Sequence, residues 1–278
     1  MANHLVLGMD GFSIEEVDMR VERMSSRAHG GQWGRRGQRH PRQGLSTEEK
    51  ERREKEVMRK DPVCVWKRGS VHCHVGFCNV RTLRVKRTVA ATGELDDTGT
   101  EKVETMKQRM RDHNLYALAM SEVRRDGSGA EDIGDGYTLV FNGSGPLGGV
   151  AVMLGPAASR AWRAGGCRTL SRKGGRVLVC TLKLAGREGR WHIISGYGPT
   201  LQAEVEDKEA FWSQMEEVLS EIPAAEVVCL VGDFNSRVGS RGAGEDGVAA
   251  ALGPHGLGPR NSSGEALLEF CGRHRLRV

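Results

Sequence analysis

Short apolar runs alternate with polar, helix-like segments along this 278-residue chain once the first 70 residues are passed. Runs of this kind, bounded by glycine or by polar side chains, are typical of buried strands. The segments that we expect to form strands are 71–80, 115–123, 136–141, 148–154, 176–184, 191–197 and 225–235, with a last strand beginning at 276.

Other segments repeat their apolar residues at helical spacing. Val103 and Met106, for example, share one side of a helix whose other side is charged. The helices expected from this spacing cover 101–114, 208–222 and 264–275. Hairpins and strand–helix–strand units are mixed in this order, which fits neither a doubly wound fold nor a pure sandwich. Two mixed sheets packed face to face, with helices outside, satisfy it. The sequence therefore predicts an α+β fold.

The first 70 residues differ from the rest in composition. They are rich in Gly, Arg and Gln and poor in apolar side chains, so we expect a disordered, charged extension in 1–70 and a folded domain in 71–278. Two interpretations stay open for the arginines of this extension: nuclear localisation or contact with RNA or protein on one side, and a plain flexible segment on the other. The arginines concerned are Arg35, Arg36, Arg39 and Arg42.

Charge follows the same division. The chain has a net charge of +5, but 1–70 holds 15 Lys and Arg against 11 Asp and Glu, whereas 71–278 holds 26 against 25. A strongly basic DNA-binding globule is therefore not indicated. The sequence shows neither an apolar run long enough to span a bilayer nor a secretion signal, so we expect a nuclear or cytoplasmic protein without a membrane partner.

The seven cysteines are expected to be reduced. Cys64, Cys73, His74 and Cys78 lie close in sequence, but they contain no Cys-x-x-Cys pair, so structural thiols are favoured over a zinc site.

Polar residues stand at the ends of four expected strands. Asn79, Glu122 and Tyr197 each close one of them, and Asp233 and Asn235 close another. A carboxylate at the end of a buried strand is costly unless it finds a cation or hydrogen-bond donors. Because Mg²⁺ prefers carboxylate and amide oxygens, this inventory predicts a shared site for Mg²⁺, with Mn²⁺ as the alternative ion.

Six motifs in order, CNVRTL, SEVR, GVAVML, YGPT, GDFNSRVG and HGLGPRNSSGEALLEFC, resemble the endonuclease/exonuclease/phosphatase superfamily. More narrowly, they are similar to the endonuclease domain of RTE-type non-LTR retrotransposons. The resemblance covers 74–278 and says nothing about 1–70. It implies a four-layer α/β/β/α sandwich of two packed mixed sheets, with DNA as the substrate.

The resemblance also implies a role for each residue that matches a motif. Glu122 corresponds to the metal-binding glutamate, and Asn79 to the asparagine that supports metal and phosphate. Tyr197 corresponds to the tyrosine that contacts the scissile phosphate. Asp233 corresponds to the aspartate that positions or protonates the reacting oxygen, and Asn235 to the amide that orients the phosphate.

Arg124 and Arg125 follow Glu122 and are candidates for phosphate or DNA contact, against an ordinary solvated surface. Asp112-His113 is interpreted as a surface pair on the first helix.

The sequence departs from the family pattern in two ways. Cys78 replaces the usual tryptophan of the first motif, and the 278 residues end before a further aspartate-containing strand and a Ser-Asp-His motif. We therefore expect the last strands to be missing and the activity to be weak or absent, since loss of a general acid/base typically costs about 10²–10⁴-fold in rate. The competing hypotheses are a non-catalytic remnant that binds nucleic acid or protein and, less favoured, a phosphatase or deadenylase of the same superfamily.

Overall fold

The structure is a computed structural model, and its description covers part of the chain. The described residues are 3–7, 12–20, 65–67, 70–83, 98–143, 145, 148–172, 174–184, 189–240, 251–252 and 258–278.

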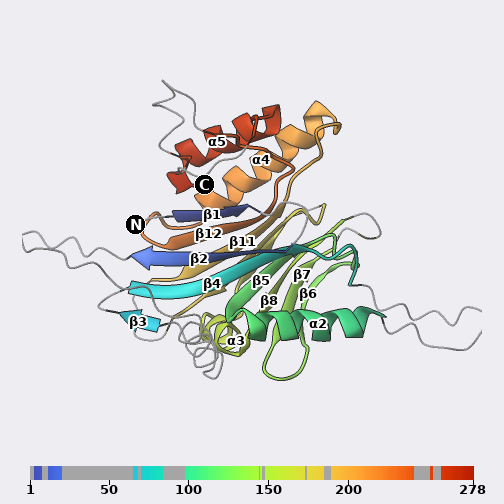
Figure 1. Ribbon diagram of the computed structural model, residues 1–278, viewed down its shortest axis with the longest axis vertical. Helices are drawn as coiled ribbons and strands as arrows, with labels where there is room; N and C mark the ends of the chain where they lie inside the picture. The colour runs from blue at the N-terminus through green and yellow to red at the C-terminus, as the bar shows by residue number, and fades with distance from the viewer. Residues whose placement is uncertain are drawn as a thin grey trace, which may run out of the picture.

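Two mixed β-sheets form the centre of the molecule (Figure 1). The first has the strand order β13-β1-β12-β11-β10-β9, and the second has the order β2-β4-β5-β8-β7-β6, with β3 paired to β4. The bounds of the first sheet's strands are β1 Asn3–Leu7, β9 Thr169–Ser171, β10 Val177–Leu182, β11 Trp191–Tyr197, β12 Val227–Asp233 and β13 Leu276–Arg277. Those of the second sheet are β2 Phe12–Arg20, β3 Val65–Lys67, β4 Ser70–Asn79, β5 Leu115–Ser121, β6 Ser128–Asp132, β7 Thr138–Asn142 and β8 Val150–Leu154.

Helices cover the outer faces of both sheets (Figure 1). Helices α4 (Val205–Ser220) and α5 (Ser262–Arg273) lie on the first sheet, and α2 (Thr98–Asp112) lies on the second. The short helix α3 (Pro156–Ala164) contributes Ala158 and Trp162 to the core between the sheets. This arrangement confirms the predicted α+β fold with two packed mixed sheets and helices outside.

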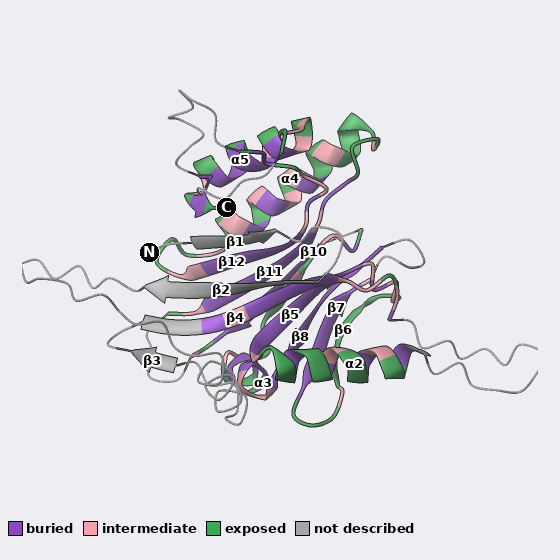
Figure 2. Ribbon diagram, viewed as in Figure 1, coloured by how far each residue is buried: buried purple, intermediate pink, exposed green. Residues whose placement is uncertain are grey.

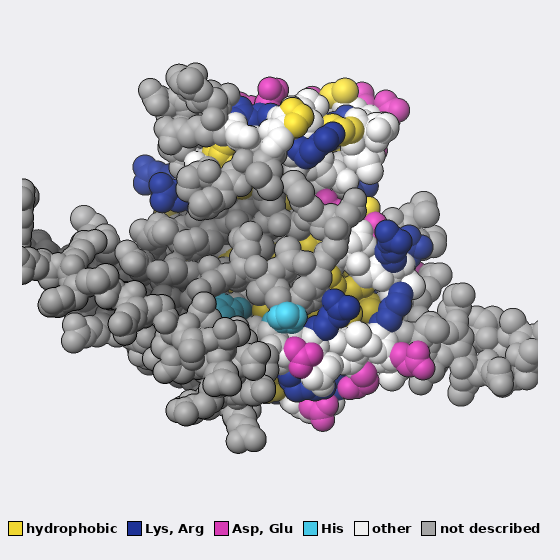
Figure 3. Space-filling view, in the orientation of Figure 1, with side chains coloured by type: hydrophobic (Ala, Val, Ile, Leu, Met, Phe, Trp, Pro, Cys, Tyr) yellow, Lys and Arg dark blue, Asp and Glu magenta, His cyan; other side chains and the backbone are white. Residues whose placement is uncertain are grey.

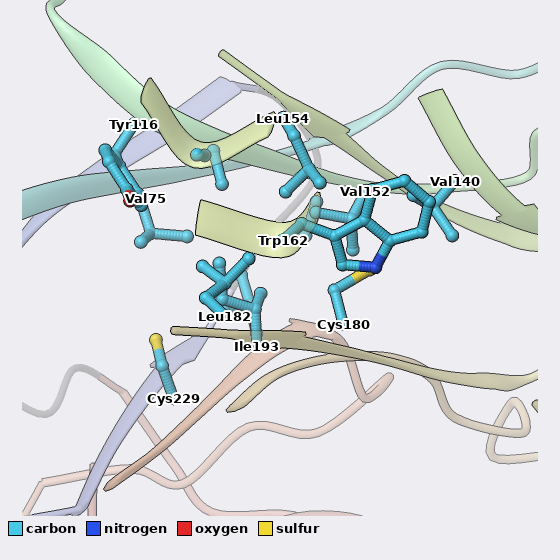
Figure 4. Packing of buried hydrophobic residues seen from close by; sticks show 14 of the residues in the cluster. Val75, Tyr116, Val140, Val152, Leu154, Trp162, Cys180, Leu182, Ile193 and Cys229 are labelled. Atoms are coloured by element: carbon cyan, nitrogen blue, oxygen red, sulfur yellow. The ribbon is translucent and has the colours of Figure 1, made fainter. Parts of the chain in front are cut away.

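Three buried clusters correspond to the three interfaces between these layers. The central one fills the space between the sheets with side chains such as Val75, Leu154, Leu182 and Ile193 (Figure 4). A second lies between the first sheet and α4 and α5, and a third between the second sheet and α2. Strand β5 is buried at every position because it has a neighbouring layer on both faces (Figure 2).

The spacing of apolar residues predicted helices α2, α4 and α5 to within a few residues. Strand β6, helix α3 and strand β9 had no clear pattern in the sequence. Strand β6 is exposed throughout and carries the sequence SGAED, so it lacks the apolar residues that mark a strand. Helix α3 and strand β9 are short and lie in a segment to which the sequence assigned no element.

The structure also differs from the prediction for 1–70, where it places strands β1, β2 and β3. Strand β1 pairs in parallel with β12 and with β13, and β2 pairs antiparallel with β4 along the length of both. Exposed strand edges pair readily through backbone hydrogen bonds, a property that side-chain composition does not report. Arg35, Arg36, Arg39 and Arg42 lie outside the described residues, and the division of the chain at residue 70 stays a prediction.

In the part of the chain that the structure describes, none of the helices is both long and apolar enough to cross a lipid bilayer.

Two glycines allow β11 and β12 to approach each other just before both strands end. Gly196 and Gly232 are register partners, and a Cβ atom at Gly232 would lie 2.0 Å from the Gly196 carbonyl oxygen. The next pair in this register is Tyr197 and Asp233. The glycine pair therefore sets the spacing of these two polar residues.

We expect Gly232→Ala to lower the free energy of unfolding by about 1–3 kcal/mol or more, because the added methyl group overpacks the strand pair. Urea denaturation followed by tryptophan fluorescence measures this. The matched control is Gly272→Ala in α5, where a Cβ atom meets nothing within 4 Å. That helix substitution should instead stabilise the protein by roughly 0.5–1 kcal/mol. Equal stability of the two variants would contradict the close approach.

Candidate active site

The polar strand ends of both sheets meet at one edge of the sandwich. In the second sheet β4 and β5 are parallel, and Asn79 is the register partner of Ser121, the residue before Glu122. In the first sheet β11 and β12 are parallel and end together at Tyr197 and Asp233. Carboxyl ends of parallel strands lie at the same edge of a sheet, and in α/β folds this edge displays functional groups.

Glu122 is the centre of the cluster. Asn79 Nδ2 donates a hydrogen bond of 2.7 Å to Glu122 Oε1, and the Tyr197 hydroxyl donates a longer one of 3.4 Å to the same oxygen. Arg124 donates to the other oxygen, Oε2, at 3.1 Å. The sequence-predicted residues Asn79, Glu122, Tyr197 and Arg124 are thus in direct contact.

The protonation of Glu122 follows from these contacts. The hydrogen bond from Asn79 has the largest effect and lowers the pKa of this carboxyl below its ordinary value, while burial opposes it. Arg124 and Tyr197 lower the pKa further. Glu122 is therefore an ionised carboxylate at neutral pH, which is the form that binds cations.

Tyr197 connects the two carboxylates electrostatically. Burial raises the pKa of its hydroxyl, and the negative charges of Glu122 and Asp233 raise it further. Both carboxylates thus act on the same hydroxyl, although they belong to different sheets. Tyr197 stays protonated at neutral pH and remains a hydrogen-bond donor.

The loop after β12 is held by two asparagine contacts. The Asn235 backbone N–H donates to Asp233 Oδ1 at 2.9 Å, and Asn235 Nδ2 donates to the Gly198 carbonyl at 2.9 Å. The Gly198 N–H donates in turn to the Asp233 carbonyl at 2.8 Å. Asn235 thus ties the end of β12 to the loop after Tyr197, and its own φ of 49° is in the left-handed region.

The two basic residues after Glu122 have different environments. Arg124 contacts Glu122, whereas Arg125 pairs with Glu131 at 2.6 Å and lies over the ring of Phe141 at 4.9 Å. Lys and Arg side chains are spread over the visible face, and several of them lie at the right of the view between α2 and the layer of α4 and α5 (Figure 3). Contact of Arg124 or Arg125 with a phosphate stays a prediction.

Arg176 belongs to the site and was missed from the sequence. Its NH1 atom donates to the Tyr197 carbonyl at 3.1 Å, and its guanidinium lies 5.5 Å from the centre of the Tyr197 ring. The Tyr197 N–H donates back to the Arg176 carbonyl at 2.9 Å. Arg176 therefore holds Tyr197 through three contacts, two to its backbone and one to its ring. The sequence did contain a signal for Arg176, because an antiparallel hairpin places the start of the expected strand 176–184 opposite the end of the expected strand 191–197.

Two other predicted residues lie outside the cluster. Asp112 is exposed at the end of α2, where it accepts a hydrogen bond from Gln108. Cys78 is buried, with its thiol 3.7 Å from the Met106 sulfur, and burial raises its pKa to about 12. A thiol in that state packs as a small hydrophobe at the position where the family pattern has tryptophan.

The oxygen atoms of the cluster suit a hard cation. Among the described residues no group of three or more His, Cys, Asp or Glu is placed to hold a metal ion. Mg²⁺ does not need such a group, because it is commonly bound through one or two carboxylates and keeps several waters. Ionised Glu122 is the primary candidate ligand. Asn79 Oδ1 already accepts from the Arg81 N–H at 3.1 Å and has one lone pair left.

The sequence resembles known proteins over part of its length. No family model matches the sequence. The chain is similar to craniofacial development protein 2 of Bos taurus, with 29% identity over 179 residues, which are 64% of this chain and 28% of that protein. The protein of the same name from Tragulus javanicus is 28% identical over 179 residues, which are 29% of its length. The chain thus matches less than a third of the length of these relatives.

Among solved structures, the AP endonuclease LMAP from Leishmania major aligns with a TM-score of 0.45 and 15% identity, over 71% of this chain and 65% of its own. A humanized TDP2 of D. rerio aligns with a TM-score of 0.33 and 11% identity, over 50% and 61%. The relatives support the resemblance to an endonuclease/exonuclease/phosphatase-like superfamily that the sequence motifs indicated.

Removal of the Asn79 amide should raise the pKa of Glu122. Asn79→Ala deletes the donor with the largest effect, so the carboxyl returns toward its ordinary value. Because its folded-state pKa is lowered, ionised Glu122 stabilises the fold at pH values above the ordinary carboxyl pKa, and this stabilisation is lost as the pH falls through the folded-state pKa. The free energy of unfolding of Asn79→Ala should therefore decrease less with falling pH over that range. Titration of the Glu122 carboxyl carbon by NMR measures the change. Asn235→Ala is the control, since Asn235 contacts Gly198 and not Glu122; a Glu122 pKa that moves only in this control would refute the assignment.

Proposed function

We propose that this edge of the sandwich is the active site of a Mg²⁺-dependent DNA endonuclease domain of retrotransposon origin. The observation that carries the proposal is the convergence of ionised Glu122, protonated Tyr197 and Asp233 from two sheets. The resemblance of the sequence motifs to the endonuclease/exonuclease/phosphatase superfamily favours a phosphodiester substrate. A nuclear or cytoplasmic location belongs to the same proposal.

The residues divide the chemistry between them. Glu122, with Asn79, would hold Mg²⁺, which when bound supplies Lewis-acid stabilisation to the phosphate oxygens. The Tyr197 hydroxyl, a protonated donor whose bond to Glu122 is long at 3.4 Å, would turn to a phosphate oxygen and orient the scissile bond. Asn235 presents an amide at the same edge, and Asp233 exchanges a proton with the reacting oxygen. Arg176 keeps Tyr197 in place through the contacts described above.

Nicking of supercoiled plasmid DNA tests the proposal. Cleavage should require Mg²⁺ or Mn²⁺ and stop on chelation, and Glu122→Gln and Asp233→Asn should each lower the rate by about 10²-fold or more. Asp112→Asn, which removes the same charge from the exposed end of α2, should cleave like the unmodified chain. Cleavage that persists in Asp233→Asn, or that is insensitive to chelation, would rule the mechanism out.

The alternative function is binding of nucleic acid without turnover. It is favoured by the arginines of the N-terminal segment, which lie in a stretch of the sequence without acidic residues, 23–47. In that case affinity for DNA or RNA should fall steeply with salt, and exchanging the four arginines for glutamine should reduce both the affinity and the salt slope. The arginines to exchange are Arg35, Arg36, Arg39 and Arg42. Electrophoretic mobility shift at several salt concentrations measures this, and unchanged binding by the variant would exclude the segment.

A further inference from the structure

The guanidinium of Arg124 is a cation already bound at Glu122. Arg124 NH2 lies 3.1 Å from Glu122 Oε2, with side-chain exposures of 41% for Arg124 and 20% for Glu122. The Nε atom of Arg124 is buried and has no hydrogen-bond partner in the described part of the chain. The guanidinium is thus held at the site through one of its ends while a second donor stays unsatisfied, which is an unfavourable state for a buried polar atom.

The backbone, and not a flexible side chain alone, brings this pair together. Glu122 and Arg124 have φ values of 55° and 51°, in the left-handed region that residues other than glycine rarely adopt. The Arg124 N–H donates to the Gly148 carbonyl at 2.7 Å. Val123, between the pair, is fully buried, and a Cβ atom at Gly149 would lie 2.9 Å from its Cγ2. Strain of this kind persists where the surroundings over-determine the backbone, and it is concentrated at functional sites.

The two oxygens of Glu122 are not equally open. Oε1 accepts from both Asn79 and Tyr197, so its two lone pairs are engaged. Oε2 accepts only from Arg124 among the hydrogen bonds described for this carboxylate, so it keeps one lone pair. A divalent ion that coordinates Glu122 therefore approaches Oε2, where a guanidinium charge is in place. Two cations at one carboxylate oxygen repel each other.

We propose that Arg124 is a built-in competitor of the divalent ion for Glu122. Binding of the ion displaces the guanidinium from Oε2, and the displaced guanidinium becomes available to an anion such as a phosphodiester. The anion stabilises the guanidinium in its displaced position. Anion and metal therefore bind with positive coupling, so that each raises the affinity of the chain for the other. This inference rests on the proposed function, since it places the metal at Glu122.

Direct Mn²⁺ binding, measured by electron paramagnetic resonance on the full chain without DNA, tests the competition independently of catalysis. Arg124→Gln should bind Mn²⁺ about tenfold more tightly than the unmodified chain, because a positive charge a few ångströms from the ion is removed. Arg124→Lys, which keeps the charge, should stay near the unmodified affinity and so separates charge from packing. Arg273→Gln removes the same charge from α5, where Arg273 pairs with Glu216, and should leave Mn²⁺ binding unchanged.

The coupling is measured by repeating the titration with a short DNA duplex. Duplex should tighten Mn²⁺ binding to the unmodified chain several-fold more than to Arg124→Gln, because the variant has no guanidinium to transfer. Mn²⁺ binding to Arg124→Gln that is no tighter than to the unmodified chain, or undetectable in both, would overturn the competition.

A third variant distinguishes this failure from failure of the proposed function. If Glu122→Gln loses Mn²⁺ binding while Arg124→Gln gains nothing, the metal site stands and the role of Arg124 is refuted. If Glu122→Gln binds Mn²⁺ as well as the unmodified chain, the metal is not at Glu122, and both proposals are refuted together. Circular dichroism and urea denaturation of each variant confirm that the fold is retained.

Discussion

A carboxylate at the end of a fully buried strand needs hydrogen-bond donors, and most residues of this site supply them to Glu122 or hold the residues that do. Strand β5 is buried at every position, and Glu122 follows it directly. Leaving such a charge without partners would cost several kcal/mol. The donors come from β4 through Asn79, from the other sheet through Tyr197, and from the turn itself through Arg124. One charge thereby ties the edges of two sheets together.

The first sheet holds the polar residues at its own strand ends in a different way. Tyr197 and Asp233 are brought side by side by a strand pair that narrows at Gly196 and Gly232. Arg176 and Asn235 then hold the two strand ends from outside, mainly through backbone carbonyls. These contacts orient the functional side chains at the strand ends. Positioning by backbone contacts of this kind leaves a site organised before the substrate arrives.

A neutral tyrosine and an ionised carboxylate lie between two arginines at the site. Arg176 lies on Tyr197, Tyr197 on Glu122, and Glu122 on Arg124. Such an arrangement is suited to exchanging one ionic partner for another, since a cation and a phosphate can replace an internal ion pair without leaving a charge unpaired. The left-handed backbone at Glu122 and Arg124 keeps the pair in register for that exchange.

Much of the fold was predictable from local patterns, and the failures have identifiable causes. The expected strand 191–197 coincides with β11, and the expected helix 208–222 overlaps α4, because burial imposes periods of 2 and 3.6 on the sequence. Strand β6 was missed because it is exposed and so carries no period. The strands within 1–70 were missed because backbone pairing to β12 and β4 involves partners far away in the chain.

The sequence by itself determined most element types after residue 70, apart from β6, α3 and β9, and the oxygen-bearing residues at the strand ends, since both depend on the burial of neighbouring positions. Only the tertiary structure decided how these residues divide their contacts. Arg124 and Arg125 are adjacent and chemically identical, yet one lies on Glu122 and the other on Glu131 and Phe141. The choice depends on backbone dihedrals and on the register of strands distant in sequence, and neither leaves a periodic trace in the order of the amino acids.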